Sequence, residues 1–196
     1  MALNNKDTKQ EDHFLEKAVR GDRDGLEYLV EIYKDLAYTI AIKIVLNNED
    51  AEEVVQDSFM KAFASLSSFR KASKFSTWLY RIVYNTAITR LNAKRMNTVD
   101  LDDQPEREEY IIDENREWKL LIQADKKKYI DLALDKLKKD DRLVITMYYI
   151  AEKNISEIGE IMDLKKSAVK MRLLRGRKQL ETELNLLLND ELKDLL

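Results

Sequence analysis

Several residue types that support particular kinds of chemistry are absent or rare in this chain of 196 residues. Cysteine is absent, which excludes disulfides, cysteine metal sites and thiol catalysis. The single histidine, His13, lies in a polar N-terminal stretch, so neither a zinc site nor a Ser-His catalytic pair is expected. We predict no catalytic residues, no metal, no cofactor and no small-molecule substrate.

Proline and glycine are also scarce, with one and four copies, so long helices are permitted almost everywhere. Neither a strand pattern nor an internal repeat is visible. No apolar run reaches the roughly 18 residues that a membrane span needs, and no signal-peptide pattern opens the chain. We therefore expect an all-α cytoplasmic protein, whose 44% hydrophobic and 36% charged residues are enough for a helical core.

Charge is strongly segregated along the chain, although the net charge is only −3. The stretch from Phe59 to Val99 contains eight Lys and Arg residues and no acid, whereas residues 100–117 contain nine acids and two arginines. The second stretch has few apolar residues and holds the only proline, which is typical of a linker. We predict two small helical domains, at 10–98 and 123–196, joined by an acidic linker at 99–122.

Apolar residues at helical spacing predict the positions of the helices. The expected ranges are 13–20, 25–46, 50–66 with Asp50 as N-cap, 76–94, 128–138, 141–151, a helix–turn–helix within 155–180 and an extended last helix over 184–196. In the helix–turn–helix, Ser156 is the expected N-cap of the first helix. The second helix is expected to begin at Lys165, Lys166 or Ser167.

The second helix of this helix–turn–helix carries seven cations and no acid between Lys165 and Lys178, a local field that fits phosphate binding. At a rotation of ~100° per residue, four residues lie within about 60° of one another around the helix axis, and this stripe should face the core; it consists of Val169, Leu173, Gly176 and Leu180. Met171 and Leu174 lie on the opposite side among cations. They are either isolated surface apolar residues or part of a face that reads the DNA major groove.

Two other segments leave alternatives open. On the helix expected over 50–66, Val55, Phe59, Ala62 and Leu66 should be core, and the opposite side is either a protein-docking patch or an ordinary solvated face; it carries Glu53, Gln56, Asp57, Met60 and Ala64. The acid-free segment 69–95 mixes aromatic and basic residues, which fits single-stranded DNA or a core helix with a basic rim. Its buried stripe should be Leu79, Ile82, Val83 and Thr86, with Trp78, Arg81, Asn85 and Thr89 on another side.

Three segments in this order and spacing resemble the bacterial extracytoplasmic-function sigma factors of the sigma-70 family. They are DAEEVVQDSFMKAF (50–63), FSTWLYRIVYNTAITRLNAKR (75–95) and the helix–turn–helix (155–180). The resemblance covers about Phe14 to Leu184. It implies a non-catalytic transcription initiation factor that binds core RNA polymerase, recognises −35 and −10 promoter elements and helps to open the promoter.

The resemblance also assigns surfaces. Residues 50–60 would dock on the β′ clamp helices of the polymerase, using Glu53, Gln56, Asp57 and Met60. Residues 67–95 would melt and capture the −10 element, with a flipped base held by the loop near 67–76; the candidate residues are Arg70, Lys71, Lys74, Phe75, Trp78, Arg81, Asn85 and Thr89. The −35 element would be read by the second helix of the helix–turn–helix; the candidate residues are Lys166, Ser167, Lys170, Met171, Arg172, Leu174, Arg175, Arg177 and Lys178.

Further partners follow from the resemblance. The C-terminal domain should dock on the polymerase β flap, and the acidic linker should thread through the active-site and RNA-exit channels, although a solvated spacer has the same composition. An anti-sigma factor is an expected partner, and it could hold the protein at the inner membrane.

Three positions depart from the family pattern. Thr89 replaces the usual Asp, Lys165 replaces a capping Ser, and Gly159 replaces Ala at a helix-propensity cost of about 1 kcal/mol.

Two other functions remain as alternatives. One is a stand-alone helix–turn–helix regulator, and the other is a sigma-like decoy held by an anti-sigma factor.

Overall fold

The computed structural model describes residues 5–70, 72–97 and 128–194, and all regular structure in these ranges is helical. The N-terminal half contains α1 (Asn5–Val19), α2 (Arg23–Val45), α3 (Asn48–Ala64), the 3₁₀ turn η1 (Leu66–Ser68) and α4 (Phe75–Asn97). The C-terminal half contains a helix over 128–136, followed by α6 (Lys139–Tyr149), α7 (Ile155–Met162) and α8 (Lys166–Asp194). The expected all-α fold is confirmed, whereas the whole of the expected linker, residues 99–122, lies outside the described residues.

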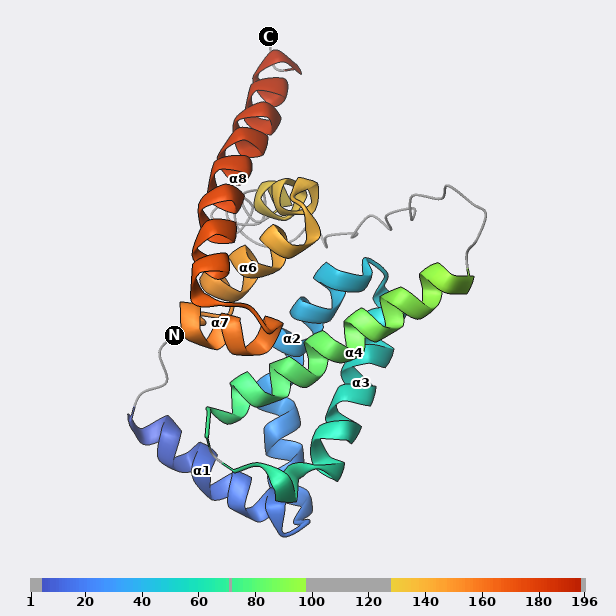
Figure 1. Ribbon diagram of the computed structural model, residues 1–196, viewed down its shortest axis with the longest axis vertical. Helices are drawn as coiled ribbons and strands as arrows, with labels where there is room; N and C mark the ends of the chain where they lie inside the picture. Colours follow the sequence, from blue (N-terminus) through green and yellow to red (C-terminus); the bar gives the residue numbers. More distant parts are fainter. Residues whose placement is uncertain (1–4, 71, 98–127, 195–196) are drawn as a thin grey trace, which may run out of the picture.

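The N-terminal half is a bundle in which α2 packs against α1, α3 and α4 (Figure 1). Helix α1 crosses α2 at Gly25, where an added Cβ would lie 2.8 Å from the carbonyl oxygen of Phe14. A side chain at this crossing would force the two backbones apart, so glycine is required for the close approach. Asp22 is the N-cap of α2, because its side chain accepts a hydrogen bond from the Gly25 N–H.

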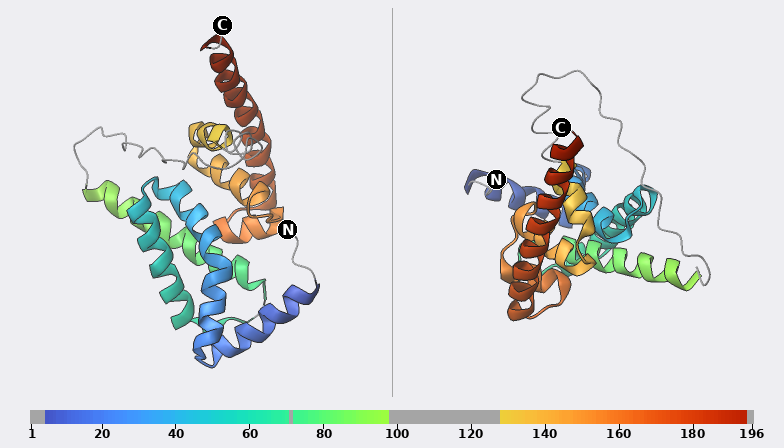
Figure 2. Two further views of the ribbon diagram at one scale, coloured as in Figure 1. Left: turned by 180° about the vertical axis from the view of Figure 1, so that it is seen from behind. Right: turned by 90° about the horizontal axis from the view of Figure 1, so that it is seen from above.

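The ends of two helices differ from the sequence predictions. Asn47, not Asp50, caps α3, since the Asn47 side chain accepts a hydrogen bond from the Asp50 N–H. Asp50 is instead buried and bonded to Arg90 and Lys94 of α4. The tail is not a separate helix, because α8 runs without a break from the helix–turn–helix to Asp194 and projects away from the rest of the molecule (Figures 1 and 2).

The two halves pack against each other. Helix α7 lies against α4 and helix α6 lies against α2, so the helix–turn–helix rests directly on the N-terminal bundle (Figure 2). Buried residues of both halves, including Leu79 and Val83 of α4 and Ile158 and Ile161 of α7, belong to one continuous hydrophobic cluster. This contact brings together residues that are far apart in the sequence.

Candidate nucleic-acid and protein-docking surfaces

The helix–turn–helix is formed by α7 and α8, with a short turn between them. Asn154 caps α7 in a capping box: its side chain accepts from the backbone N–H of Ser156 and Glu157, and the Glu157 carboxylate accepts from the Asn154 N–H. The predicted N-cap, Ser156, is therefore wrong, and the Asn-x-x-Glu spacing was the signal that could have identified the true cap. Helix α8 begins at Lys166, one of the expected starts.

The turn after α7 explains why residue 159 is a glycine and not the alanine that is usual in the family. Asp163 ends this helix in the left-handed region, at φ 54°, and the N–H of Leu164 donates to the Gly159 carbonyl over 2.8 Å. An added Cβ at Gly159 would lie 2.7 Å from the carbonyl oxygen of Leu164. An alanine here would gain helix propensity but would push against the backbone of the turn.

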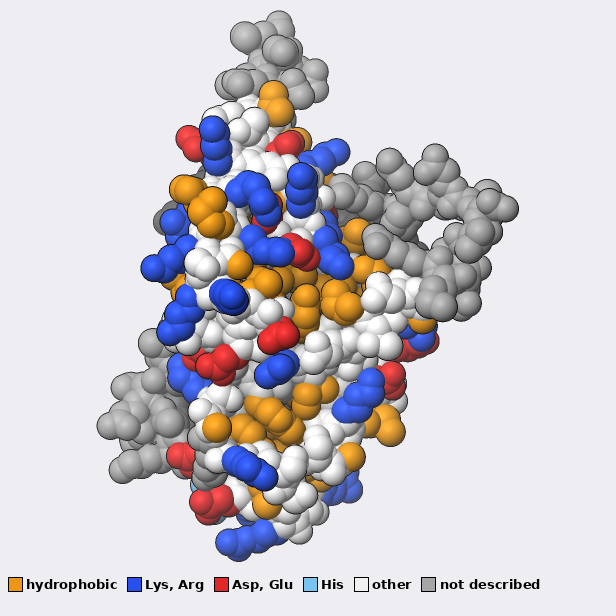
Figure 3. Space-filling view, viewed as in Figure 1, with side chains coloured by type: hydrophobic (Ala, Val, Ile, Leu, Met, Phe, Trp, Pro, Cys, Tyr) orange, Lys and Arg blue, Asp and Glu red, His pale blue; other side chains and the backbone are white. Residues whose placement is uncertain are grey.

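The outward face of α8 matches the predicted periodicity. Val169, Leu173 and Gly176 are buried, while Met171 and Leu174 are each 64% exposed. The cationic neighbours Lys166, Lys170 and Lys178 are also exposed, and Figure 3 shows Lys and Arg side chains gathered over this part of the molecule. Apolar and cationic side chains therefore share one solvent-facing surface, which suits contact with thymine methyls and phosphates.

Three arginines of α8 have partners within the C-terminal half. Arg175 donates from Nε and Nη2 to the two carboxylate oxygens of Asp141, and each donor–acceptor distance is 2.5 Å. Arg172 pairs with Asp140, and the Arg177 guanidinium lies about 5.5 Å from the rings of two tyrosines, Tyr148 and Tyr149. These contacts were not predicted, because the partners come from another helix, α6.

A second surface lies on α3. Glu53, Gln56, Asp57, Met60 and Ala64 are exposed as predicted, and Met60 is 64% exposed. The inward side differs slightly from the prediction: Val54 is buried in the core, whereas Val55 is only half-buried.

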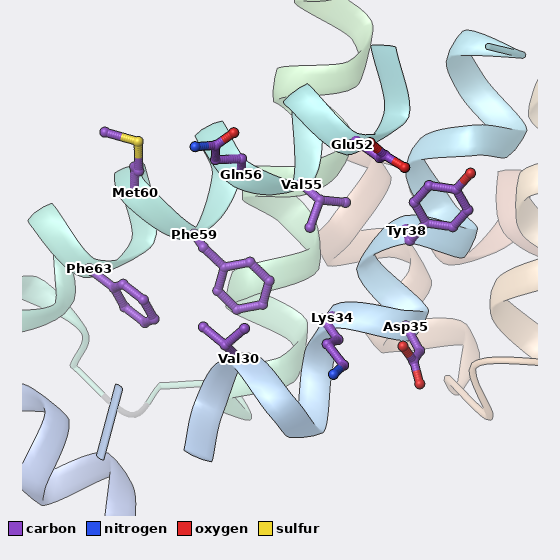
Figure 4. A pocket seen from close by; sticks show the side chains of 10 residues that line it. All are labelled: Val30, Lys34, Asp35, Tyr38, Glu52, Val55, Gln56, Phe59, Met60 and Phe63. Atoms are coloured by element: carbon purple, nitrogen blue, oxygen red, sulfur yellow. The ribbon is translucent and has the colours of Figure 1, made fainter. Parts of the chain in front are cut away.

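An apolar groove of about 500 Å³ runs beside this face, between α2 and α3 (Figure 4). Figure 4 shows the Phe59 ring and the Val30 and Val55 side chains pointing into it, with Met60 at its edge. Polar and charged residues also line the groove; these are Lys34, Asp35, Glu52 and Gln56. The groove was not predicted, because it needs side chains from two helices.

Ion pairs hold α3 against α4 behind this surface. Arg90 pairs with Asp50 at 2.9 Å and with Glu53 at 2.5 Å, and Lys94 pairs with Asp50 at 2.5 Å. Burial opposes ionisation of Asp50, but the hydrogen bonds from Lys94 and Arg90 outweigh it and lower its pKa. The ion pair with Arg90 of α4 also holds the Glu53 side chain in place.

The third surface contains the loop before α4 and the exposed side of that helix. Arg70, Lys74, Arg81, Asn85 and Thr89 are exposed, and Lys71 lies outside the described residues. On the opposite side, Leu79, Val83 and Thr86 are buried as predicted, while Ile82 is half-buried.

Phe75 does not fit its expected contact with DNA. It is only 3% exposed, with its ring centroid 5.4 Å from that of Tyr33 and 5.6 Å from that of Trp78. Phe69 completes this aromatic cluster. Phe75 therefore supports the loop from beneath, whereas Trp78 is only half-buried.

Neither a metal-binding cluster nor a membrane-spanning helix is found in the described ranges. Within them, no group of His, Asp and Glu side chains could hold a metal ion. None of the helices described there is long and apolar enough to cross a bilayer.

Two family models match this chain. Sigma-70 region 2 matches residues 29–96, and Sigma-70 region 4 matches residues 127–180. The chain is 30% identical over 176 residues to the ECF RNA polymerase sigma factor SigW of Bacillus subtilis, covering 87% of this chain and 94% of SigW. It is 29% identical over 175 residues to the ECF RNA polymerase sigma-E factor of Escherichia coli K12, covering 86% and 91%.

Solved structures share the fold. CnrH in complex with the cytosolic domain of CnrY matches with a TM-score of 0.61 and 23% identity, over 88% of this chain and 95% of that chain. The sigma factor RpoE in complex with the anti-sigma factor NepR from Bartonella quintana matches with a TM-score of 0.68 and 22% identity, over 81% and 96%.

Proposed function

This chain belongs to the extracytoplasmic-function sigma factors of the sigma-70 family, and we propose that its three surfaces divide the work of transcription initiation. It binds core RNA polymerase, directs it to promoters with −35 and −10 elements and assists their opening. The observation that carries the proposal is the outward face of α8, where exposed Met171 and Leu174 lie among cations. The protein itself performs no covalent chemistry and works in the cytoplasm, where polymerase and promoter are.

The face of α3 and the adjoining groove dock on the β′ clamp helices. Gln56, Asp57 and Met60 are exposed beside an apolar groove, and Glu53 is held in position by Arg90. An apolar groove with a polar rim is the usual composition of a protein interface. The domain that carries this surface extends over residues 10–98.

The exposed side of α4 and the loop before it capture the −10 element as a single strand. Trp78 can stack on a base, and Arg81, Asn85 and Thr89 continue the same exposed side of the helix. Phe75 and Phe69 support this surface from beneath. Because Thr89 replaces the Asp that is usual in the family, this protein prefers a different −10 sequence.

The C-terminal domain, residues 123–196, reads the −35 element in the major groove through α8 and docks on the β flap. The linker, residues 99–122, passes through the polymerase channels. Its acidic composition suits these channels, because a channel built for nucleic acid has a basic surface. An anti-sigma factor is the proposed regulator. The overall negative charge makes autonomous DNA binding weak, so the polymerase positions both domains.

Run-off transcription with bacterial core polymerase and a library of promoter fragments tests the proposal. Transcripts that start at a fixed distance below a shared −35 and −10 pair are expected. Binding to core without initiation would favour the decoy alternative. Failure to bind core, together with tight binding to one DNA sequence, would favour the stand-alone regulator.

A further inference from the structure

Helices α6 and α8 approach each other closely at Gly176. An added Cβ at this residue would lie 2.8 Å from Cγ1 of Ile145 and 3.4 Å from the carbonyl oxygen of Asp141. A larger residue would therefore push α8 away from α6. Because Arg175 directly precedes this glycine, the close approach brings its side chain within reach of the first turn of α6, which carries Asp140 and Asp141.

The two members of the Asp141–Arg175 pair differ sharply in exposure. The Asp141 side chain is fully buried, whereas the Arg175 side chain is 58% exposed. Both oxygens of the carboxylate accept from the same edge of the guanidinium, formed by Nε and Nη2. The carboxylate also lies in the first turn of α6, where the helix dipole favours a negative charge. One edge of the guanidinium is thus anchored to the interior, while much of the side chain faces solvent.

The anchored guanidinium keeps a second hydrogen-bonding edge. A guanidinium carries five N–H donors in one plane, and the Asp141 carboxylate uses two of them. One N–H on Nη1 and one on Nη2 remain as a parallel pair on the next edge, which is the arrangement that reads O6 and N7 of guanine in the major groove. Exposed Met171 lies one turn before Arg175, and exposed Leu174 directly precedes it. The remaining edge therefore belongs to the proposed −35-reading face.

The other two arginines of α8 are held differently. Arg172 bonds to Asp140 through Nη1, an atom of the edge that would read guanine, and its side chain is only 24% exposed. Arg177 is exposed but lies over the rings of two tyrosines of α6, which leaves its charge available to phosphates. Among these three arginines, Arg175 alone combines two bonds to a buried acid with a mostly exposed side chain.

We propose that Asp141 is a positioning residue for promoter recognition: by holding the Nε–Nη2 edge of Arg175, it directs the Nη1–Nη2 edge toward a guanine of the −35 element. This inference rests on the proposed function of α8. An arginine without this partner would give up rotamer freedom on binding and could turn to a phosphate instead. Asp141 also neutralises much of the charge of Arg175, so the pair discriminates by the direction of its hydrogen bonds more than by attraction to the DNA backbone.

The test measures run-off transcription by the holoenzyme from promoters with each of the four bases at every −35 position. The wild type should prefer guanine at one position, and Arg175→Ala should reduce that preference by about five- to hundredfold, the range for a bidentate contact with one base. Replacing this guanine with 7-deazaguanine, which lacks the N7 acceptor, should lower initiation by the wild type but not by Arg175→Ala.

The Asp141 variants test the positioning role itself. Asp141→Asn should reduce the same guanine preference by about three- to tenfold, because an amide accepts from only one of the two N–H groups. Initiation from promoters with another base at this position should not fall, since the variant removes a negative charge and leaves Arg175 able to bind phosphate. In the Arg175→Ala background, Asp141→Asn should have no further effect on the preference.

Asp141→Leu is a second variant, which covers the case that Asp141→Asn does not fold. Leucine has the same branching as aspartate and leaves no unpaired polar group in the interior, and replacing a buried ion by an apolar side chain of similar shape is often tolerated. It should reduce the guanine preference at least as much as Asp141→Asn does. Thermal unfolding identifies the variants that are folded under the assay conditions.

Asp140→Asn is the matched control. It changes the neighbouring acid and releases Arg172 instead, so the guanine preference should not change. Arg177→Ala is the control for a phosphate contact: it should weaken promoter binding about equally for all −35 sequences and reduce the salt dependence of binding by about one unit of slope.

Three results would overturn the positioning role. The first is an unchanged guanine preference in the folded Asp141 variants when Arg175→Ala has lost it. The second is a loss in those variants that is equal for all −35 sequences, which would assign the pair a purely structural role. The third is a wild type without any guanine preference that depends on Arg175. Each of these leaves the proposed function intact, which fails only if the wild type supports no −35-dependent initiation.

Discussion

Met60 and Met171 provide a paired test of the two main surfaces, because both are methionines and each is 64% exposed. Met60 lies at the edge of the groove beside α3, whereas Met171 lies on the outward face of α8. Truncating either side chain to alanine removes little of the core, so the folded protein should be almost unaffected. Each variant should therefore lose binding to one partner only.

The magnitude follows from the exposed area. Complete burial of a methionine side chain contributes about 1.5–3 kcal/mol, so burying the exposed two-thirds contributes about 1–2 kcal/mol. At about 1.4 kcal/mol per factor of ten, Met60→Ala should weaken binding to core polymerase by about 5- to 30-fold. Met171→Ala should leave core binding unchanged and reduce initiation at promoters that depend on the −35 element by a similar factor.

Fluorescence titration with core polymerase measures the first effect, and run-off transcription at saturating core measures the second. Thermal unfolding of both variants should match that of the wild type. Equal core affinity of Met60→Ala and the wild type would refute the docking assignment. A large loss of thermal stability would show that the exposed fraction misrepresents the role of the side chain, and an effect of Met171→Ala on core binding would refute the separation of the surfaces.

Three further changes test the fold around these surfaces. Asp50→Asn should lower the free energy of unfolding by about 1–3 kcal/mol at neutral pH, because Arg90 and Lys94 lose a buried carboxylate partner. Since the pKa of Asp50 is lowered on folding, this contribution is present above the usual carboxyl pKa of ~3.9 and is lost as pH falls through the folded pKa, so denaturation curves of variant and wild type should converge in acid. Asn154→Ala should cost about 1 kcal/mol of stability by thermal unfolding, and an unchanged melting temperature would contradict the capping box. Gly25→Ala should destabilise the protein by about 1–3 kcal/mol because its Cβ meets the α1 backbone, whereas stabilisation in the same assay would mean that helix propensity dominates.

Local patterns in the sequence were sufficient to identify helices, their faces and the charged segments. The buried stripe and exposed methionine of α3, and the corresponding features of α8, follow from a 3.6-residue period that each helix carries in its own residues. The fold class followed from the same periods. Helix caps were less certain, because Ser156 and Asn154 are both chemically suitable N-caps, and what favours Asn154 is the capping-box partner Glu157 three residues later.

Contacts between distant segments were decided only by the tertiary structure. These contacts join residues from different segments of the chain; they are the burial of Phe75, the groove between α2 and α3, the pairing of Arg175 with Asp141, and the hydrogen bond from Lys153, in the loop between α6 and α7, to Ser76 of α4. Periodicity states which side of a helix is buried, but it does not state which helix covers it. The sequence by itself therefore determined an all-helical protein with a basic, partly apolar recognition helix, whereas packing between helices decided how its arginines are oriented and how its two halves close on each other.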